Sequence, residues 1–333
     1  MRLAYFDCFS GISGAMALSA AVHGGADLGE ISEALSSLPT AGFELEREDV
    51  EVLGISAARV HVRSRTEGVI WTYASIRAML DQAELPPQAR RISLRAFRLL
   101  AEADGRVHAR EADLVTFHDA GEPDVLVSMI GTALALHQLH VDRIFASPIP
   151  TGLGMARTEH GMSPIPSPVV MELLKGAPTY SRGIPVELVT PVGAAILAAV
   201  AEGYGDMPMM RAELVGYGAG HTRLDFPNVV RMVVGEEERA GARGGPGVEG
   251  VLLETRLGEA GPQAVPALLD ELGEAGAIDA WLTPVVGRDG EPAVMASAVA
   301  PPQAIPAVRR ILEGRAIGGL VRALPLLPET QGP

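Results

Sequence analysis

Residues 2–22 read RLAYFDCFSGISGAMALSAAV, and this stretch decides the fold. Residues 2–7 are mostly apolar and predict a buried strand, which runs into the glycine turn Gly11-Ile12-Ser13-Gly14. Apolar residues from Ala15 to Val22 then predict a helix. A strand that passes through a glycine turn into a helix is typical of α/β proteins.

The residues that follow extend this pattern. Residues 43–53 and 57–64 alternate between apolar and polar about Gly54, which predicts a hairpin. Helical spacing of apolar residues predicts further helices at 73–81, 87–105, 122–139, 168–174 and 191–201. Strands are predicted at 144–147, 211–217 and 228–234, and residues 148–168 are expected to form an irregular loop. We therefore expect an N-terminal α/β domain over residues 1–238.

A charged, glycine-rich stretch, EEERAGARGGPGVEG at 236–250, shows no periodicity and predicts a linker at 239–249. The elements predicted beyond it are strand 251–256, helix 263–275, strands 278–286 and 292–299, helix 303–313 and strand 317–323. This is the β-α-β-β-α-β order of a ferredoxin-like domain, here over residues 250–333. The predicted fold class is thus α/β (α+β) in two domains.

Composition limits the function. The 333 residues carry a net charge of −14, which disfavours nucleic acid as a partner. The chain contains one cysteine, and it has neither a secretory signal nor an apolar run long enough to span a membrane. We expect a cytoplasmic protein that acts on a small molecule and forms a homo-oligomer, most simply a dimer, through its small domain.

The glycine turn is the first candidate site. A turn between a strand and a helix presents backbone N–H groups that suit an anion such as a phosphate. Asp7 would lie at the carboxyl end of the strand, where it is a candidate acid or base. The candidate phosphate- or substrate-binding residues here are Cys8, Ser10, Gly11, Ser13 and Gly14. The alternative is a tight turn with a serine cap and a cysteine in the core.

Two further segments combine imidazole and carboxylate groups. His118 and Asp119 precede a predicted helix that carries Asp124 in its first turn, and Glu159 and His160 lie in a proline-stiffened loop. Such groups perform acid–base chemistry or bind a metal, although a helix cap explains the aspartates equally well. We take His118, Asp119, Glu159 and His160 as candidate catalytic residues.

The last candidate is Thr190, followed by Pro191. A threonine cap with proline in the first helical position predicts a helix start, where an anion could bind. Thr190 and Asp124 therefore join the candidate substrate-binding residues.

Taken together, these motifs resemble the LarC family of nickel-insertion proteins. The matching segments, in order, are YFDCFSGISG (5–14), FHDAG (117–121), HGMSPIPSPVVMELLKG (160–176), ELVTPVGAAIL (187–197), GYGAG (216–220) and FPNVVR (226–231). The resemblance implies CTP-dependent insertion of nickel into pyridinium-3,5-bisthiocarboxylate mononucleotide, with Mg²⁺ or Mn²⁺ accompanying the nucleotide. It continues weakly over residues 250–325, where the family has a small CTP-handling domain.

Several signature residues of the family differ here. Ala15 and Ser128 replace acids, Thr116 replaces a histidine, and Asp119 stands for a glutamate. The acidic stretch of the family's small domain is replaced at 256–263, and its lysine-rich loop at 287–290; the small domain is also predicted to be truncated. If a metal site is retained, the resemblance assigns it to His118, Asp119, Asp124 and His160.

These losses favour a repurposed scaffold. We predict a metal-independent acid–base enzyme that needs no cofactor and condenses an aromatic amine with an aldehyde, as in a Pictet–Spengler cyclisation of a biosynthetic pathway. The alternative is the family's nickel insertion, with Ni²⁺, CTP and a pyridinium mononucleotide. A second alternative is a non-catalytic binding paralogue.

Overall fold

A computed structural model describes residues 1–39, 42–64, 71–117, 122–158, 161–238, 251–257, 264–286, 292–316 and 320–325. The chain divides into two compact units, Met1–Glu238 and Arg239–Pro333. We describe each unit by itself.

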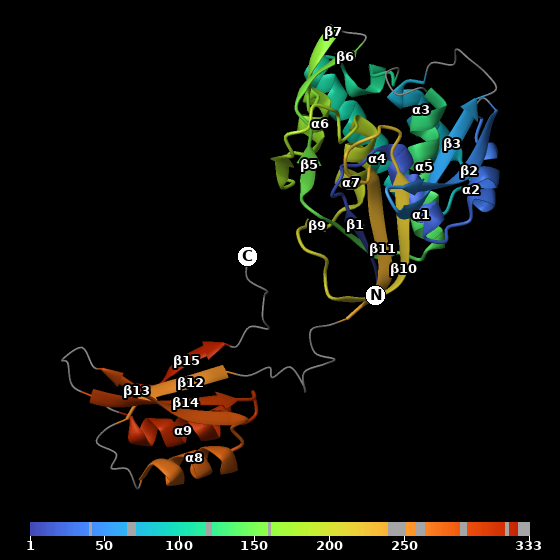
Figure 1. Ribbon diagram of the computed structural model, residues 1–333. Coiled ribbons are helices and arrows are strands. Elements are labelled where there is room, and N and C mark those ends of the chain that lie inside the picture. The colour runs from blue at the N-terminus through green and yellow to red at the C-terminus, as the bar shows by residue number, and fades with distance from the viewer. Residues whose placement is uncertain are drawn as a thin grey trace. The chain divides into compact units, whose positions relative to one another are not determined.

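The larger unit mixes helices and strands (Figure 1). Its helices are α1 (Gly14–His23), α2 (Leu28–Ser36), α3 (Tyr73–Gln82), α4 (Pro87–His108), α5 (Glu122–Gln138), α6 (Pro168–Leu173) and α7 (Pro191–Val200). Its strands are β1 (Arg2–Asp7), β2 (Phe43–Val52), β3 (Ile55–Ser64), β4 (Arg143–Ala146), β5 (Ile149–Thr151), β6 (Gly154–Thr158), β7 (Gly161–Ile165), β8 (Thr179–Ser181), β9 (Gly203–Tyr204), β10 (Met210–Ala219) and β11 (Val229–Glu237).

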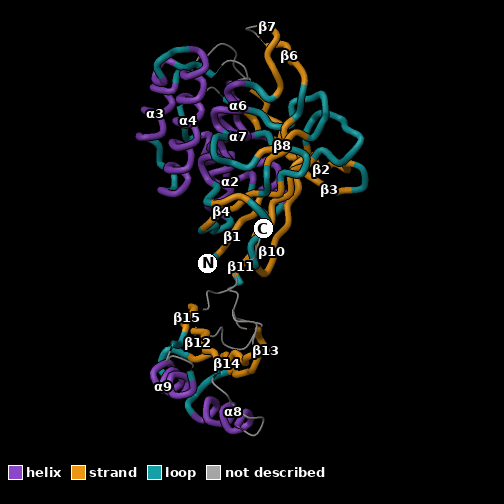
Figure 2. Tube along the Cα trace, turned by 90° about the vertical axis from the view of Figure 1, so that its left-hand side faces the viewer, coloured by secondary structure: helices purple, strands orange, loops and turns teal. Residues whose placement is uncertain are grey.

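Seven strands form one mixed sheet in the order β2-β3-β10-β11-β1-β4-β9. Strand β1 lies in its interior, antiparallel to β11 and parallel to β4. Helix α1 packs on β3, β10 and β11, α7 packs on β4, and α4 and α5 pack on these helices. Figure 2 shows the helices gathered on one side of the strands, so that the main core lies between the two layers.

Glycines bring α1 unusually close to the sheet. A Cβ atom built on Gly218 would lie 1.9 Å from the carbonyl oxygen of Met16, and one on Gly216 would lie 1.9 Å from that of Ala20. Any side chain at either position would collide with the backbone of α1. The glycines of the GYGAG motif therefore serve helix–strand packing.

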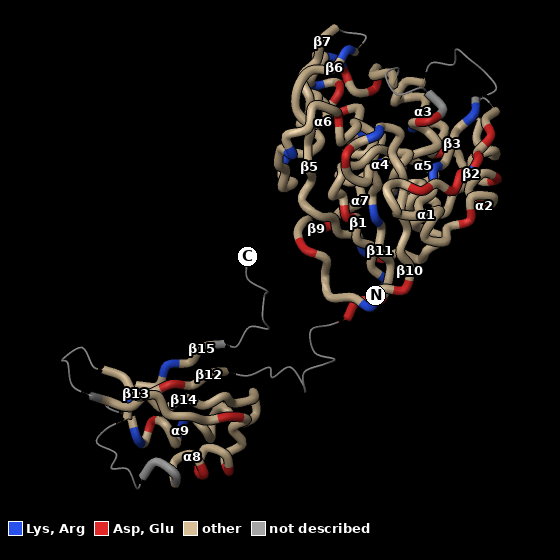
Figure 3. The backbone as a smooth tube through the Cα atoms, in the orientation of Figure 1, with Lys and Arg blue, Asp and Glu red and all other residues tan. Residues whose placement is uncertain are grey.

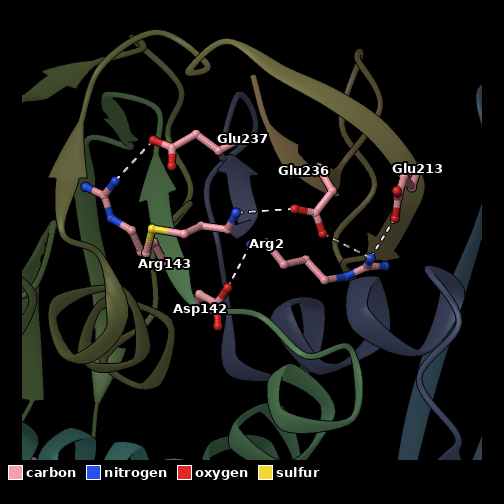
Figure 4. A network of polar contacts seen from close by, with 7 residues as sticks. Arg2, Asp142, Arg143, Glu213, Glu236 and Glu237 are labelled. Atoms are coloured by element: carbon pink, nitrogen blue, oxygen red, sulfur yellow. Dashed lines mark hydrogen bonds and ion pairs between the residues drawn. The ribbon is translucent and has the colours of Figure 1, made fainter. Parts of the chain in front are cut away.

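The amino end of β1 is held by ion pairs and hydrogen bonds (Figure 4). The amino terminus lies 3.3 Å from Glu236, and the Arg2 guanidinium lies 2.6 Å from Glu213. The backbone N–H of Arg2 also donates to Asp142 over 2.8 Å. These contacts tie the amino end of β1 to its surroundings, while its backbone pairing with β11 and β4 sets its register.

The edge strand β2 and its neighbour β3 carry many charges, which face each other across the hairpin (Figure 3). Glu46 pairs with Arg63 at 2.6 Å, while Glu48 contacts Arg59 at 3.3 Å and His61 at 2.8 Å. Exposed pairs of this kind add little stability, but charged side chains keep a sheet edge from pairing with other chains.

The smaller unit confirms the predicted β-α-β-β-α-β order. Its elements are β12 (Val251–Arg256), α8 (Ala264–Glu274), β13 (Asp279–Val286), β14 (Pro292–Ala300), α9 (Ile305–Arg315) and β15 (Arg322–Pro325). The sheet order is β13-β14-β12-β15, and leucine and alanine side chains from sheet and helices form its core. The last strand begins later than predicted, at Arg322.

The sequence missed several short elements. Helix α2 buries only Ile31 and Leu35, one turn apart, which is too small an apolar stripe to recognise. The segment predicted as an irregular loop contains β5, β6 and β7, and each has at most five residues, too few to show strand periodicity. The hairpin of β6 and β7 projects from the larger unit (Figure 1). None of the described helices is both long and apolar enough to cross a membrane.

The packing of α1 on β10 leads to a first prediction. Gly218→Ala should lower the free energy of unfolding by about 1–3 kcal/mol, because the added methyl group forces the helix off the sheet. Thermal and urea unfolding of the full chain measure this effect. Gly273→Ala in α8, where an added Cβ meets nothing within 4 Å, is the control and should be neutral or slightly stabilising. Equal stability of wild type and Gly218→Ala would refute the packing argument.

Candidate functional site

Two helices begin side by side at the carboxyl end of β1. Ser13 caps α1 by accepting a hydrogen bond from the Met16 N–H over 3.2 Å, and Thr190 caps α7 by accepting one from the Gly193 N–H, also over 3.2 Å. The two approach segments are tied together, because Ile12 donates to the Leu188 carbonyl and accepts from the Thr190 N–H. The structure therefore brings two candidate residues that are distant in sequence, Ser13 and Thr190, to adjacent helix starts.

Glycines make this proximity possible. A Cβ on Gly14 would lie 2.4 Å from Val192 of α7 and 2.7 Å from Ser128 of α5. Gly11 has a positive φ of 96°, which favours glycine, and a Cβ there would lie 1.9 Å from the Leu188 carbonyl oxygen. Both candidate glycines are thus required by the backbone geometry of the turn.

Helix α5 runs in the same direction as α1. Ser128 lies against Gly14, and one turn further along both helices Gly131 lies against Leu18. Asp124 is one turn before Ser128 on the same face of α5, so it lies beyond the start of α1. Three helices therefore direct their positive N-terminal ends toward one region.

Three backbone N–H groups in this region have no hydrogen-bond acceptor within the described ranges. They belong to Gly14 and Ala15 of α1 and to Val192 of α7. Ala15 stands where the related family has an acid, so the first turn of α1 contains no carboxylate. These unpaired donors and the helix dipoles together suit an anion.

Two carboxyl groups border these helix starts. Asp124 is in the first turn of α5, and Glu187 directly precedes Leu188, whose carbonyl bonds Ile12. Both residues keep part of their surface in water, but the surrounding protein displaces enough water to raise the pKa of each carboxyl. Each is therefore a better proton acceptor near neutral pH than an ordinary surface carboxylate.

Asp7 lies at the end of β1 and is paired across the sheet. It stands opposite Arg231 of β11, and the guanidinium lies 2.5 Å from its carboxylate. The Asp7 side chain is 17% exposed. Asp7 is accordingly an anchored carboxylate at the predicted place, and its predicted catalytic role remains a prediction.

Cys8 and Ser10 are completely buried. The Cys8 N–H donates to the Ser147 hydroxyl, and the Ser10 hydroxyl donates to the Val229 carbonyl over 2.6 Å. Burial also raises the pKa of the Cys8 thiol far above its ordinary value. Both residues hold the turn against the sheet, and their predicted contact with a ligand stays a prediction.

The four predicted catalytic residues other than Asp7 lie outside the described residues: His118, Asp119, Glu159 and His160. The structure therefore does not place three of the four residues to which the resemblance assigned a metal. Across the part of the chain that is described, no three or more His, Cys, Asp or Glu side chains cluster in a way that could hold a metal ion.

Three residues of the region were not singled out from the sequence. Glu187 belongs to a motif chosen for Thr190 alone. Arg231 interrupts the otherwise apolar run VVRMVV, a signal that could have been recognised. Arg182 donates to the Phe9 carbonyl and stacks on Phe226, with its guanidinium carbon 4.0 Å from the ring centre, and nothing local predicts this contact.

Comparison with known proteins identifies the family. The family model described as "Nickel insertion protein" matches residues 4–318. This chain belongs to that family, so the resemblance predicted from the motifs is confirmed. No solved structure matches the chain.

Several relatives match over most of their length. The pyridinium-3,5-bisthiocarboxylic acid mononucleotide nickel insertion protein of Desulfitobacterium hafniense (strain Y51) is 35% identical over 94% of this chain and 78% of its own. Putative nickel insertion proteins of Roseiflexus castenholzii and Syntrophotalea carbinolica are 40% and 37% identical, over 90% and 96% of this chain and 75% and 81% of their own.

These relatives favour the nickel-insertion alternative over the metal-independent condensation that we ranked first. Nothing in the comparisons supports a Pictet–Spengler enzyme or another cyclase. The absence of an acid at position 128 also has a packing explanation. Ser128 is 4% exposed and lies in the tight contact with Gly14. A short side chain at that position suits helix packing, whatever an acid does there in relatives.

The raised pKa of Glu187 predicts a pH-dependent stability difference. A carboxyl with a raised folded pKa favours the folded state most below its unfolded pKa, about 4.3, and this contribution is lost as pH rises through the folded value. Glu187→Gln removes the ionisation, so the variant should unfold at a higher temperature than wild type at pH 7. The difference should disappear below pH ~4.

Thermal unfolding at pH 7 and below pH ~4 tests this difference between Glu187→Gln and wild type. Glu51→Gln in the β2–β3 hairpin is an exposed control. A stabilisation of the same size at both pH values would contradict it.

The burial of Cys8 predicts an unreactive thiol. Because Cys8 is the chain's one cysteine, a thiol reagent such as 5,5′-dithiobis(2-nitrobenzoate) reports on it alone. The folded protein should not react, and protein unfolded in guanidinium should release one equivalent of chromophore. Rapid labelling of folded protein would show that Cys8 is accessible and support its predicted contact with a ligand.

Proposed function

We propose that this protein is an enzyme that inserts nickel into a pyridinium mononucleotide, and that the starts of α1 and α7 bind the phosphate of that substrate. Family membership and the name of the Desulfitobacterium relative support the reaction. The observation that carries the location is the pair of adjacent helix starts with three unpaired N–H groups.

The phosphate would lie against backbone rather than against long basic side chains. Gly14 lets the start of α7 approach the start of α1, and Ser13 and Thr190 hold the two first turns in place. Such a cradle is rigid before the ligand arrives, so binding costs little ordering entropy. Its partial positive charges favour a phosphate monoester over a neutral ligand.

The chemical step would use the bordering carboxyls. When a metal binds sulfur or oxygen ligands, those ligands must lose their protons. In this proposal Asp124 and Glu187 accept the protons that nickel displaces from the substrate, which their raised pKa values suit. Nickel itself is a substrate here, and it prefers imidazole or sulfur ligands. His118 and His160, outside the described residues, remain the predicted imidazoles.

We keep CTP in the proposal only because the resemblance to the family implies it. The small domain differs from the family at 256–263 and 287–290, and of these residues only Arg256 and Leu257 are described. We therefore propose CTP with Mg²⁺ or Mn²⁺ as co-substrate, and we assign no residue to either.

A matched pair of substitutions at Thr190 tests the phosphate site. Both aspartate and asparagine are good helix caps, so Thr190→Asp and Thr190→Asn should fold alike. Only the aspartate adds a negative charge beside the proposed phosphate. Thr190→Asp should weaken binding of the pyridinium mononucleotide by about tenfold or more, as expected for a like charge in contact, and Thr190→Asn should bind nearly as wild type.

Isothermal titration with the mononucleotide measures binding, and mass spectrometry of the product after addition of Ni²⁺ and CTP measures insertion. Equal binding by the two variants would show that the phosphate does not bind at the starts of α1 and α7. Absence of any nickel-containing product from wild type, under conditions in which the Desulfitobacterium relative forms it, would reject the reaction itself.

A further inference from the structure

A groove of about 360 Å³ lies between α4 and the C-terminal ends of α6 and α7. Its lining includes Ala198 and Ala201 at the end of α7, whereas the site proposed above lies at Thr190, at the beginning of that helix. A ten-residue helix spans about 15 Å, so the groove is a separate feature. Figure 2 shows α4, α6 and α7 side by side.

Small side chains create the groove. Along α4, Arg95, Leu99, Ala103 and Arg106 follow one another at helical spacing and line one wall. The facing surface is formed by Gly176, Ala177, Ala198 and Ala201, which leave space where larger residues would fill it. The floor is therefore apolar, and the charged side chains stand at its ends.

The charged side chains at one end of the groove are paired with one another. Glu172 lies 2.6 Å from Lys175 and 3.2 Å from Arg106, and Glu102 lies within 4 Å of Arg106 as well. These side chains neutralise one another and leave little attraction for an added ion.

At the other end, two hydrogen-bond donors have no partner among the described residues. Arg95 makes no ion pair or hydrogen bond with any described residue, and the Tyr204 hydroxyl likewise has no partner among them. Burial raises the pKa of Tyr204, so its hydroxyl keeps its proton and acts as a donor. Arg95, whose side chain is exposed, and Tyr204 both line the groove. A guanidinium and a phenol at one end of an apolar groove form a pair of donors for an oxyanion.

We propose that this groove binds a small amphipathic monocarboxylate, with its carboxylate on Arg95 and Tyr204 and its apolar body along the alanine floor. The volume is near the lower end of small-molecule sites and suits an acid with a single ring or a short branched chain. A doubly charged phosphate fits less well, because the single guanidinium of Arg95 balances only one of its charges and the negative C-terminal end of α7 repels the other. This site goes beyond nickel insertion and does not depend on it.

Benzoate is the probe, and benzamide is its neutral isostere. Isothermal titration and ligand-observed NMR with the full chain should detect benzoate at millimolar concentration and should not detect benzamide. Arg95→Gln should weaken benzoate binding by about tenfold, the effect of losing one charge-assisted hydrogen bond, and Tyr204→Phe by a smaller factor. Arg91→Gln, on the same helix and exposed but outside the groove lining, is the matched control and should bind as wild type.

A second variant acts through shape. Ala198→Leu places a larger side chain on the floor and should abolish binding while thermal unfolding remains cooperative. Equal binding of benzoate and benzamide, unchanged binding by Arg95→Gln, preference for inorganic phosphate, or no binding by wild type would each overturn the proposal. Because nickel insertion is not measured, failure here leaves the proposed reaction unaffected.

Discussion

The close approach of backbone to backbone around α1 is the constraint on which the larger unit depends. On one side Gly216 and Gly218 bring the helix onto β10, and on the other Gly14 brings it against α5 and α7. These contacts involve carbonyl groups and Cβ atoms that have no room to move. They fix α1 in position and direction, so the starts of three helices meet at the carboxyl end of β1.

This geometry separates two tasks. Backbone groups at Gly14, Ala15 and Val192 present donors in a fixed frame, while the carboxyls of Asp124 and Glu187 lie at the border with raised pKa values. In the proposed site, holding a ligand would therefore require no ionisable side chain, and the ionisable side chains would remain available for proton transfer. The Asp7–Arg231 pair adds a neutralised anchor beside them.

Much of this could be predicted from the sequence, because caps and glycine turns leave local signatures. The turn at 11–14, the Thr190–Pro191 helix start and the long stripe of α4 were recognised for this reason. The roles of Glu187 and Arg231 depend on neighbours about 170 and 220 residues away, so no local pattern shows them.

Reasoning from missing ligands was less successful. The prediction of a lost metal site treated every missing acid as a lost ligand. Position 128, however, lies in the contact between α5 and α1. Family membership, read from several motifs in order, was the stronger guide, because it depends on the whole arrangement of the larger unit. Residue-level losses constrain a mechanism only once the structure shows what each position touches.

The meeting of helix starts has one more consequence. Peptide dipoles carry no titratable proton, so the positive potential they create is the same in acidic and alkaline solution. In the proposed site, each neighbouring carboxyl that loses its proton adds a repulsion of the bound anion. Any pH dependence of substrate retention would thus come from the carboxyls and the phosphate, not from the backbone groups that hold the anion.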